Sequence, residues 1–141
     1  MATEPDNLDL VYAQKIFYQQ DSKTIHASFA RSVIERADEL RFMPDNLFNH
    51  YGHYFTDYVV SFDYPEFDGD MVADCFLNLL SEKFSNNSVI SAGLLQKVEQ
   101  VLHFFAENIS FFQGERDIYG DLSERLEATF LALESYQSKR Q

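Results

Sequence analysis

Apolar residues recur every three or four positions along most of the chain, the spacing that places them on one face of an α-helix. This spacing predicts six helices, at residues 8–20, 24–41, 44–62, 69–85, 91–109 and 121–137. The fifth helix has the most regular apolar stripe, which can extend it to Phe112. Val89 and Ile90 form too short a run to predict a strand. The sequence therefore predicts an all-α protein.

Few residues interrupt these helices, since the chain of 141 residues has only five Gly and three Pro. Pro44 separates the second helix from the third, because its fixed φ suits the first turn of a helix. Gly52 interrupts the third stripe, and we expect it where that helix packs closely against another. Short connections favour antiparallel neighbours. We expect a single domain over residues 1–141, either an up-and-down bundle or stacked helical hairpins, with frayed ends at 1–7 and 138–141.

Polar residues that can cap helices stand at the predicted helix starts. Asp21, Ser91 and Asp121 precede the second, fifth and sixth helices, where a side-chain oxygen can accept a free backbone N–H. Asp68 or Asp70 can cap the fourth helix, and a carboxylate there also matches the positive end of the helix dipole. The main loop of the chain directly precedes this fourth helix.

Acidic residues are unevenly distributed along the chain. There are 23 acids and 11 bases, a net charge of −12, and residues 42–82 hold eight of the acids and no base. The same segment holds ten Phe and Tyr residues. A field of this sign repels nucleic acid and anionic membranes and favours a basic partner. The alternative is that the charge serves solubility alone.

Cys75 is the only cysteine, so the chain cannot form an internal disulfide, which fits a reducing compartment. Its place on the apolar face of the fourth predicted helix indicates a small buried side chain rather than a nucleophile. The first residues are acidic and lack the apolar core of a secretory signal. The apolar runs are too short to span a membrane. We therefore expect a cytoplasmic protein.

Two groups of residues have metal-ligand chemistry without a complete motif. His50, His53 and Asp57 lie at i, i+3 and i+7, so they share one face of the third helix and are candidate zinc ligands. No Glu completes the H-E-x-x-H arrangement of a zinc protease, and the polar flank of an amphipathic helix is the favoured interpretation. Glu99 and His103 lie four residues apart, whereas di-iron bundles use a spacing of three, twice. We expect no enzyme activity, no cofactor and no metal.

The remaining candidate is a protein-binding surface. Aromatic side chains supply buried anchor area in interfaces, and carboxylates orient a basic partner. The loop at residues 63–70 combines both, and residues 115–121 repeat the mixture in a loop that a hairpin arrangement places at the same end. The candidate contact residues are Asp57, Tyr58, Asp63, Tyr64, Glu66, Phe67, Asp68, Asp70, Asp117 and Tyr119. The alternative for Tyr64 and Phe67 is that they plug the end of the bundle.

In size, charge and absence of catalytic motifs, the chain resembles the small acidic immunity proteins that bacteria pair with polymorphic or contact-dependent-inhibition toxins. The stretches at residues 40–48 and 117–121 contribute to this resemblance. The resemblance implies a tight inhibitor that fills the active site of a cationic toxin, often a nuclease, with carboxylates in place of phosphates. We therefore expect an inhibitor of a basic protein. The alternative is a helical adaptor or regulatory subunit that binds through an apolar groove, and the sequence leaves the oligomeric state open.

Overall fold

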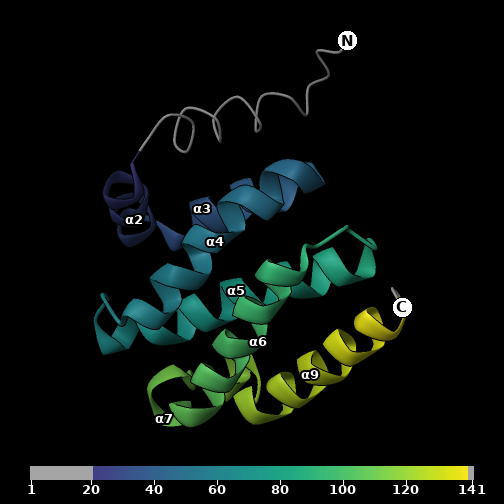
Figure 1. Cartoon of the computed structure of the whole chain (residues 1–141). Coiled ribbons are helices and arrows are strands. Elements are labelled where there is room, and N and C mark those ends of the chain that lie inside the picture. Colours follow the sequence, from purple (N-terminus) through teal and green to yellow (C-terminus); the bar gives the residue numbers. More distant parts are fainter. Residues whose placement is uncertain (1–20, 140–141) are drawn as a thin grey trace.

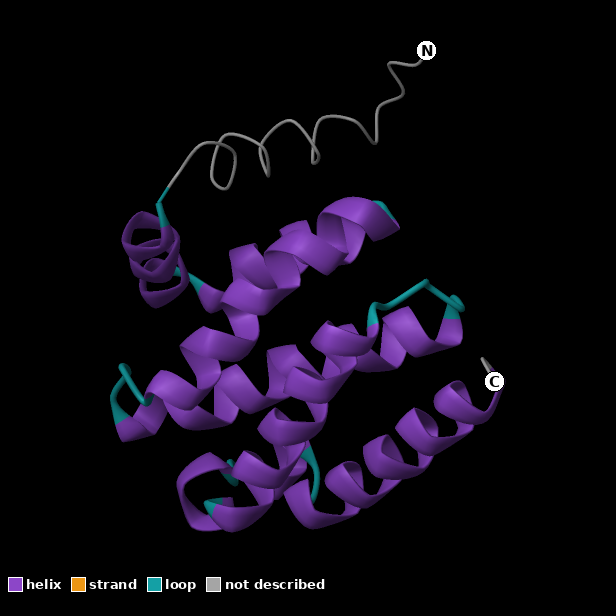
Figure 2. Ribbon diagram, viewed as in Figure 1, coloured by secondary structure: helices purple, strands orange, loops and turns teal. Residues whose placement is uncertain are grey.

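The computed structural model describes residues 21–139, which form a helical bundle (Figures 1 and 2). Its elements are α2 (Ser22–Arg31), α3 (Val33–Phe42), α4 (Asp45–Ser61), the 3-10 turn η1 (Glu66–Asp68), α5 (Gly69–Ser85), α6 (Ala92–Glu107), α7 (Ile109–Phe112), α8 (Arg116–Tyr119) and α9 (Leu122–Lys139). No strand occurs in this range, and the all-α prediction is confirmed. None of these helices is long and apolar enough to cross a membrane. The helix predicted at 8–20 lies outside the described residues, and α9 extends two residues into the tail expected to fray.

The helix predicted at residues 24–41 is two helices, because the chain turns at Ser32. This residue has φ −161° and ψ 95°, an extended conformation that ends α2 and begins α3. Its hydroxyl accepts the backbone N–H of Glu35 at 3.3 Å. Ser32 and Glu35 have the spacing of a capping box, a helix-start signal that here lies inside a continuous apolar pattern. The prediction of one continuous helix is therefore wrong.

α5 is the central helix, with α3 packed on one side and α9 on the other (Figure 1). The most extensive packing joins helices that are not consecutive, namely α3 with α5, α4 with α6, and α5 with α9. In the core, the Phe76 ring makes edge-to-face contacts with Phe55 and Phe105, at centroid distances of 5.1 and 5.8 Å. Gly52 lets α4 approach α6 as predicted, since a Cβ atom there would lie 3.0 Å from Cδ2 of Leu94. The fold is a bundle around α5 rather than a row of separate hairpins.

Three of the predicted caps are confirmed. The side chains of Asp21, Ser91 and Asp121 accept the backbone N–H three residues later, at 2.8, 3.3 and 3.3 Å. Asp68 makes no capping bond, because η1 runs directly into α5 and leaves this residue at φ −95° and ψ −9° rather than in an extended conformation. The carboxylate of Asp70 accepts the N–H of the next residue at 2.7 Å. The start of α5 is therefore set by η1 and not by a capping carboxylate.

Two basic side chains are buried, and both have partners within the chain. Arg36 donates to both carboxylate oxygens of Glu39, at 2.6 and 2.9 Å. Lys83 donates to the carbonyl of Met43 at 3.1 Å, and its ammonium lies 4.6 Å from the centre of the Phe48 ring. Burial lowers the pKa of Lys83. Within residues 21–139, no buried side-chain nitrogen or oxygen lacks a partner. Lys83 is therefore not available to neutralise surface acids, and Arg36 reaches only the neighbouring Glu35, at 3.4 Å.

Candidate partner-binding site

The loop between α4 and α5 is held against the body of the protein by aromatic contacts. Phe62 ends α4 in the left-handed region, at φ 56° and ψ 20°, which is uncommon for a bulky residue. Its ring centroid lies 4.7 Å from that of Phe104 and 4.8 Å from that of Phe111, and these contacts hold the turn. Tyr64 then donates its hydroxyl to the carbonyl of Val59 at 2.5 Å. The chain therefore leaves α4 in a fixed direction toward η1.

An aromatic cluster fills the space between this loop and the ends of α6 and α7. It consists of Phe62, Tyr64, Phe104, Phe111 and Phe112. Phe112 is its most buried member, at 1% exposed. Tyr58 packs beside the cluster, with its ring centroid 5.2 Å from that of Tyr64, and is 3% exposed. Burial raises the pKa of Tyr58 to about 12 and also raises the pKa of Tyr64.

Two of the predicted contact residues are therefore part of the packed interior. The prediction that Tyr58 contacts a partner is wrong, because its ring lies in the core between α2 and α4. Tyr64 is half-buried and closes the end of the bundle, which is the alternative that the sequence left open for it. Phe67 differs from both, since its side chain is exposed.

The two acidic loops meet, although the fold is not the row of hairpins from which their proximity was expected. Gly114 lies at the junction, where a Cβ atom would be 2.5 Å from Cβ of Asp70 and 2.5 Å from the ring of Tyr119. Only a residue without a side chain fits this close approach. Burial raises the pKa of Tyr119, and the charge of Asp70 adds to the effect. The loops at residues 63–70 and 115–121 therefore form one continuous surface.

The outer part of this junction carries like charges and two apolar tips. We call it the acidic surface, and it consists of the exposed Glu66, Phe67, Glu115, Asp117 and Ile118 together with the half-buried Asp68 and Asp70. None of its five carboxylates forms an ion pair within the described residues, while nearby Arg116 is paired with Asp121 at 3.5 Å. Phe67 is 80% exposed and Ile118 is 69% exposed, the highest values for large apolar side chains in residues 21–139. Uncompensated negative charge and accessible apolar groups therefore lie together.

Two further predicted contact residues pair with basic groups of the chain itself. Asp57 lies 2.7 Å from the ammonium of Lys97, an ion pair that joins α4 to α6. Asp63 lies 2.9 Å from Nε2 of His26, a contact that joins the loop to α2. Both carboxylates remain largely exposed. Their charges nevertheless serve contacts within the fold, which separates them from the unpaired acids of the acidic surface.

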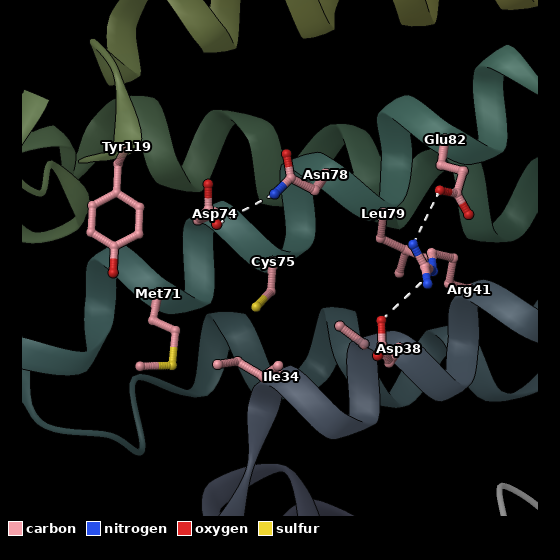
Figure 3. Close-up of a pocket in the computed structure, with 11 residues that line it drawn as sticks. Ile34, Asp38, Arg41, Met71, Asp74, Cys75, Asn78, Leu79, Glu82 and Tyr119 are labelled. Atoms are coloured by element: carbon pink, nitrogen blue, oxygen red, sulfur yellow. Dashed lines mark hydrogen bonds and ion pairs between the residues drawn. The ribbon is translucent and has the colours of Figure 1, made fainter. Parts of the chain in front are cut away.

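A groove of about 370 Å³ lies between α3 and α5, next to the acidic surface (Figure 3). Its apolar floor is formed by Ile34, Ala37, Met71, Cys75 and Leu79. Its polar rim is formed by Asp38, Arg41, Asp74, Asn78 and Glu82. Tyr119 closes the end that adjoins the acidic surface, and Arg41 lies toward the opposite end (Figure 3). The groove combines an apolar interior with a rim on which three carboxylates face Arg41 and Arg125, so that a net negative charge remains.

The sequence of α5 carries a signal for this groove. Along α5, two rows repeat every four residues, the apolar Met71, Cys75 and Leu79 and the polar Asp74, Asn78 and Glu82. Cys75 is half-buried on the groove floor instead of fully buried in the core. Burial raises the pKa of its thiol to about 11, so the thiol is neutral at physiological pH. This protonation state disfavours nucleophilic chemistry at Cys75.

The candidate zinc ligands are engaged in other contacts. In residues 21–139, no group of three or more His, Cys, Asp or Glu side chains is placed to hold a metal ion. Asp57 pairs with Lys97, and burial together with the charge of Lys97 lowers the pKa of His53. The ring of His50 packs edge-on against Tyr51, with centroids 4.6 Å apart. These side chains act as the polar flank of α4.

Comparison with known proteins gives no match. No protein-family model, no curated protein and no solved structure is significantly similar to this chain. The function is therefore argued from the acidic surface and the groove themselves.

Proposed function

We propose that this chain binds a basic protein partner through the acidic surface and inhibits that partner by covering its active site. The partner that best fits this chemistry is a cationic toxin domain, in line with the immunity proteins that the sequence resembles. The chain's net charge of −12 attracts such a partner at long range. The acidic surface then supplies the specific contacts.

The main support is the exposure of Phe67 between two unpaired acids. Phe67 is 80% exposed, and neither Glu66 nor Asp68 forms an ion pair in the part of the chain that the structure describes. An exposed Phe forgoes roughly 1.5–3 kcal/mol of burial. Aromatic side chains that fill a partner's pocket carry much of the energy of protein interfaces. Tyr64 shows that the same loop can turn an aromatic ring inward, so the outward direction of Phe67 fits an anchor for a partner.

The five unpaired carboxylates of the acidic surface orient the encounter. Opposite charge raises association rates by roughly 10–1,000-fold, and salt weakens the effect. A nuclease active site is basic because it must hold phosphates. Carboxylates can occupy the positions that phosphates otherwise take, while the helical body blocks access. Binding and inhibition then follow from the same contact.

The test compares two variants that each remove three negative charges. One neutralises the acidic surface with Glu66→Gln, Asp68→Asn and Asp117→Asn. The control neutralises α6 and α9 with Glu107→Gln, Glu127→Gln and Glu134→Gln. A partner is captured from the native source with the full chain and purified. It is then titrated with both variants at low and high salt, and its activity is assayed in the same samples.

We expect the acidic-surface variant to weaken binding at low salt by about tenfold or more and to lose inhibition in proportion. The control should stay within about twofold of the unmodified chain, because its charges lie outside the contact. Equal losses in the two variants would contradict the proposal, since binding would then depend only on net charge.

A second groove favours the alternative function, a helical adaptor. It has a volume of about 440 Å³, lies between α6 and α9, and is lined mostly by apolar side chains, including Leu131, which is 61% exposed. An adaptor would bind an apolar segment there with little dependence on salt. Binding that resists salt, survives in the acidic-surface variant and is weakened by Leu131→Ala would select this alternative, because Leu131 lines the groove.

A further inference from the structure

We propose that the groove between α3 and α5 receives a basic amphipathic helix of the same partner. This inference rests on the proposed function and adds a second contact to it. Apolar side chains of the helix would lie on the groove floor, and its Lys or Arg side chains would reach the rim. Tyr119 closes the groove, and the loop that carries it touches Asp70, so the groove and the acidic surface are continuous. One partner can therefore cover both.

The shape of the groove suits an incoming helix. α3 and α5 form the most closely packed helix pair in the described residues, and the groove runs along their junction. Ile34 projects from α3 and is 53% exposed, while Met71 and Cys75 on α5 are half-buried on the floor. Surfaces of this kind accept the apolar face of an amphipathic helix, with side chains spaced three or four residues apart. The apolar floor is therefore open to a helix from outside.

The rim selects basic side chains. Asp38 and Glu82 place carboxylates along the edge of the groove (Figure 3), and Asp74 adds a third that Arg125 of α9 already pairs at 2.8 Å. Nε of Arg41 lies 3.6 Å from Asp38, and its Nη1 lies 3.6 Å from Glu82. These separations exceed normal hydrogen-bond lengths, so neither carboxylate holds the guanidinium in a hydrogen bond, although it also lies 4.6 Å from the centre of the Phe42 ring. The rim thus already accommodates one guanidinium between two carboxylates, the chemistry that a partner's Arg would use.

Charge argues against the two occupants that the chain itself could supply. A second copy carries a net charge of −12 and would bring like charges against the rim. Residues 1–20 contain three acids and one Lys, so their excess charge has the same sign. Like charges brought together at an interface oppose binding. A basic segment from another protein is the occupant that the rim favours.

The test uses the full chain and a helical peptide of about 18 residues, with Leu on its apolar face and Lys on its polar face. The charge control is the same peptide with Glu in place of Lys. Cys75 is the only cysteine and lies on the groove floor, so its alkylation rate reports whether the groove is covered. At saturation, the Leu/Lys peptide should slow the alkylation of Cys75 by about tenfold, because only chains without bound peptide leave the thiol accessible. The Leu/Glu peptide should leave the rate unchanged.

Matched variants locate the peptide on the surface. Ile34→Ala and Leu131→Ala each truncate an exposed apolar side chain, 53% and 61% exposed, at the two different grooves. Calorimetry measures the affinity of each variant for the Leu/Lys peptide. Ile34→Ala should lower this affinity about tenfold, and Leu131→Ala should leave it within about twofold of the unmodified chain. Arg41→Gln should tighten binding, because it frees Asp38 and Glu82 for the peptide's ammonium groups.

Four results would overturn the inference while leaving the proposed function intact. The first two are absence of any peptide binding and peptide binding without protection of Cys75. The other two are weaker peptide binding by Leu131→Ala in place of Ile34→Ala, and an unchanged peptide affinity of the Arg41→Gln variant. The proposed function is judged separately, by the charge variants and the captured partner.

Discussion

The aromatic cluster and the acidic surface lie side by side, yet they differ in whether their side chains find partners within the fold. In the cluster each ring packs against other rings, and Phe112 is 1% exposed. On the acidic surface, five carboxylates form no ion pair within the described residues, and Phe67 is 80% exposed. Tyr64 and Phe67 are only three residues apart but belong to the two different regions. The aromatic residues of this segment therefore have two roles, closing the bundle and forming an accessible surface.

The chain changes direction between these two residues. Pro65 has φ −69° and precedes η1, and its carbonyl accepts the N–H of Asp68 at 2.9 Å. Tyr64 is fixed on the body by its hydroxyl bond, whereas Phe67 lies on the tight turn that follows. The contrast between the two regions is thus a property of the loop backbone. Substitutions in the aromatic cluster and on the acidic surface can test it separately.

The largest expected effect is the loss of stability on truncating a ring of the aromatic cluster. Phe112→Ala should lower the free energy of unfolding by about 3–5 kcal/mol, because it removes a fully buried aromatic side chain. The matched control is Phe67→Ala, which should change it by less than about 0.5 kcal/mol. Urea unfolding followed by the helical circular dichroism signal measures both. Similar losses in the two variants would erase the distinction between the regions.

A smaller effect is expected at alkaline pH. Burial raises the pKa of Tyr58 from its ordinary value of 10.0 to about 12, and the charges of Asp68 and Asp63 add to the effect. Between these pH values the unfolded chain loses the phenolic proton first, so stability falls as pH rises through this window. Tyr58→Phe should therefore lose less stability than the unmodified chain on going from about pH 9 to about pH 11.

Urea unfolding of the two proteins at both pH values checks this prediction. Lys83, whose lowered pKa acts in the opposite direction, is common to both proteins and cancels in the comparison. Identical losses would mean that the Tyr58 phenol titrates as it does in the unfolded chain. Tyr58 would then belong with the accessible aromatics, as the sequence had suggested.

The all-α class and most helix positions were predictable, because amphipathic helices must place apolar residues at a period near 3.6. The break at Ser32 was missed because a capping box with Glu35 lies inside an uninterrupted apolar pattern. Two competing signals overlapped there, and the local hydrogen bond prevailed over the periodicity.

The candidate site was predictable only in part. Tyr58 belongs to the apolar stripe of α4, and the structure follows that stripe rather than the charge of neighbouring Asp57. Phe67 lies in a turn without helical periodicity, so the sequence left its exposure open. The groove depends on the packing of α3 against α5, which are not consecutive helices. No pattern within α5 indicates which helix packs against it.

The most direct test of the account is the affinity of the captured partner for Phe67→Ala. Leu131→Ala serves as the control, since it also truncates an exposed apolar side chain, away from the acidic surface. We predict that Phe67→Ala binds at least about 30-fold more weakly, as expected for an anchor worth roughly 2 kcal/mol, with unchanged folding stability. Binding within about twofold of the unmodified chain would show that the partner does not use the acidic surface, and would contradict the account.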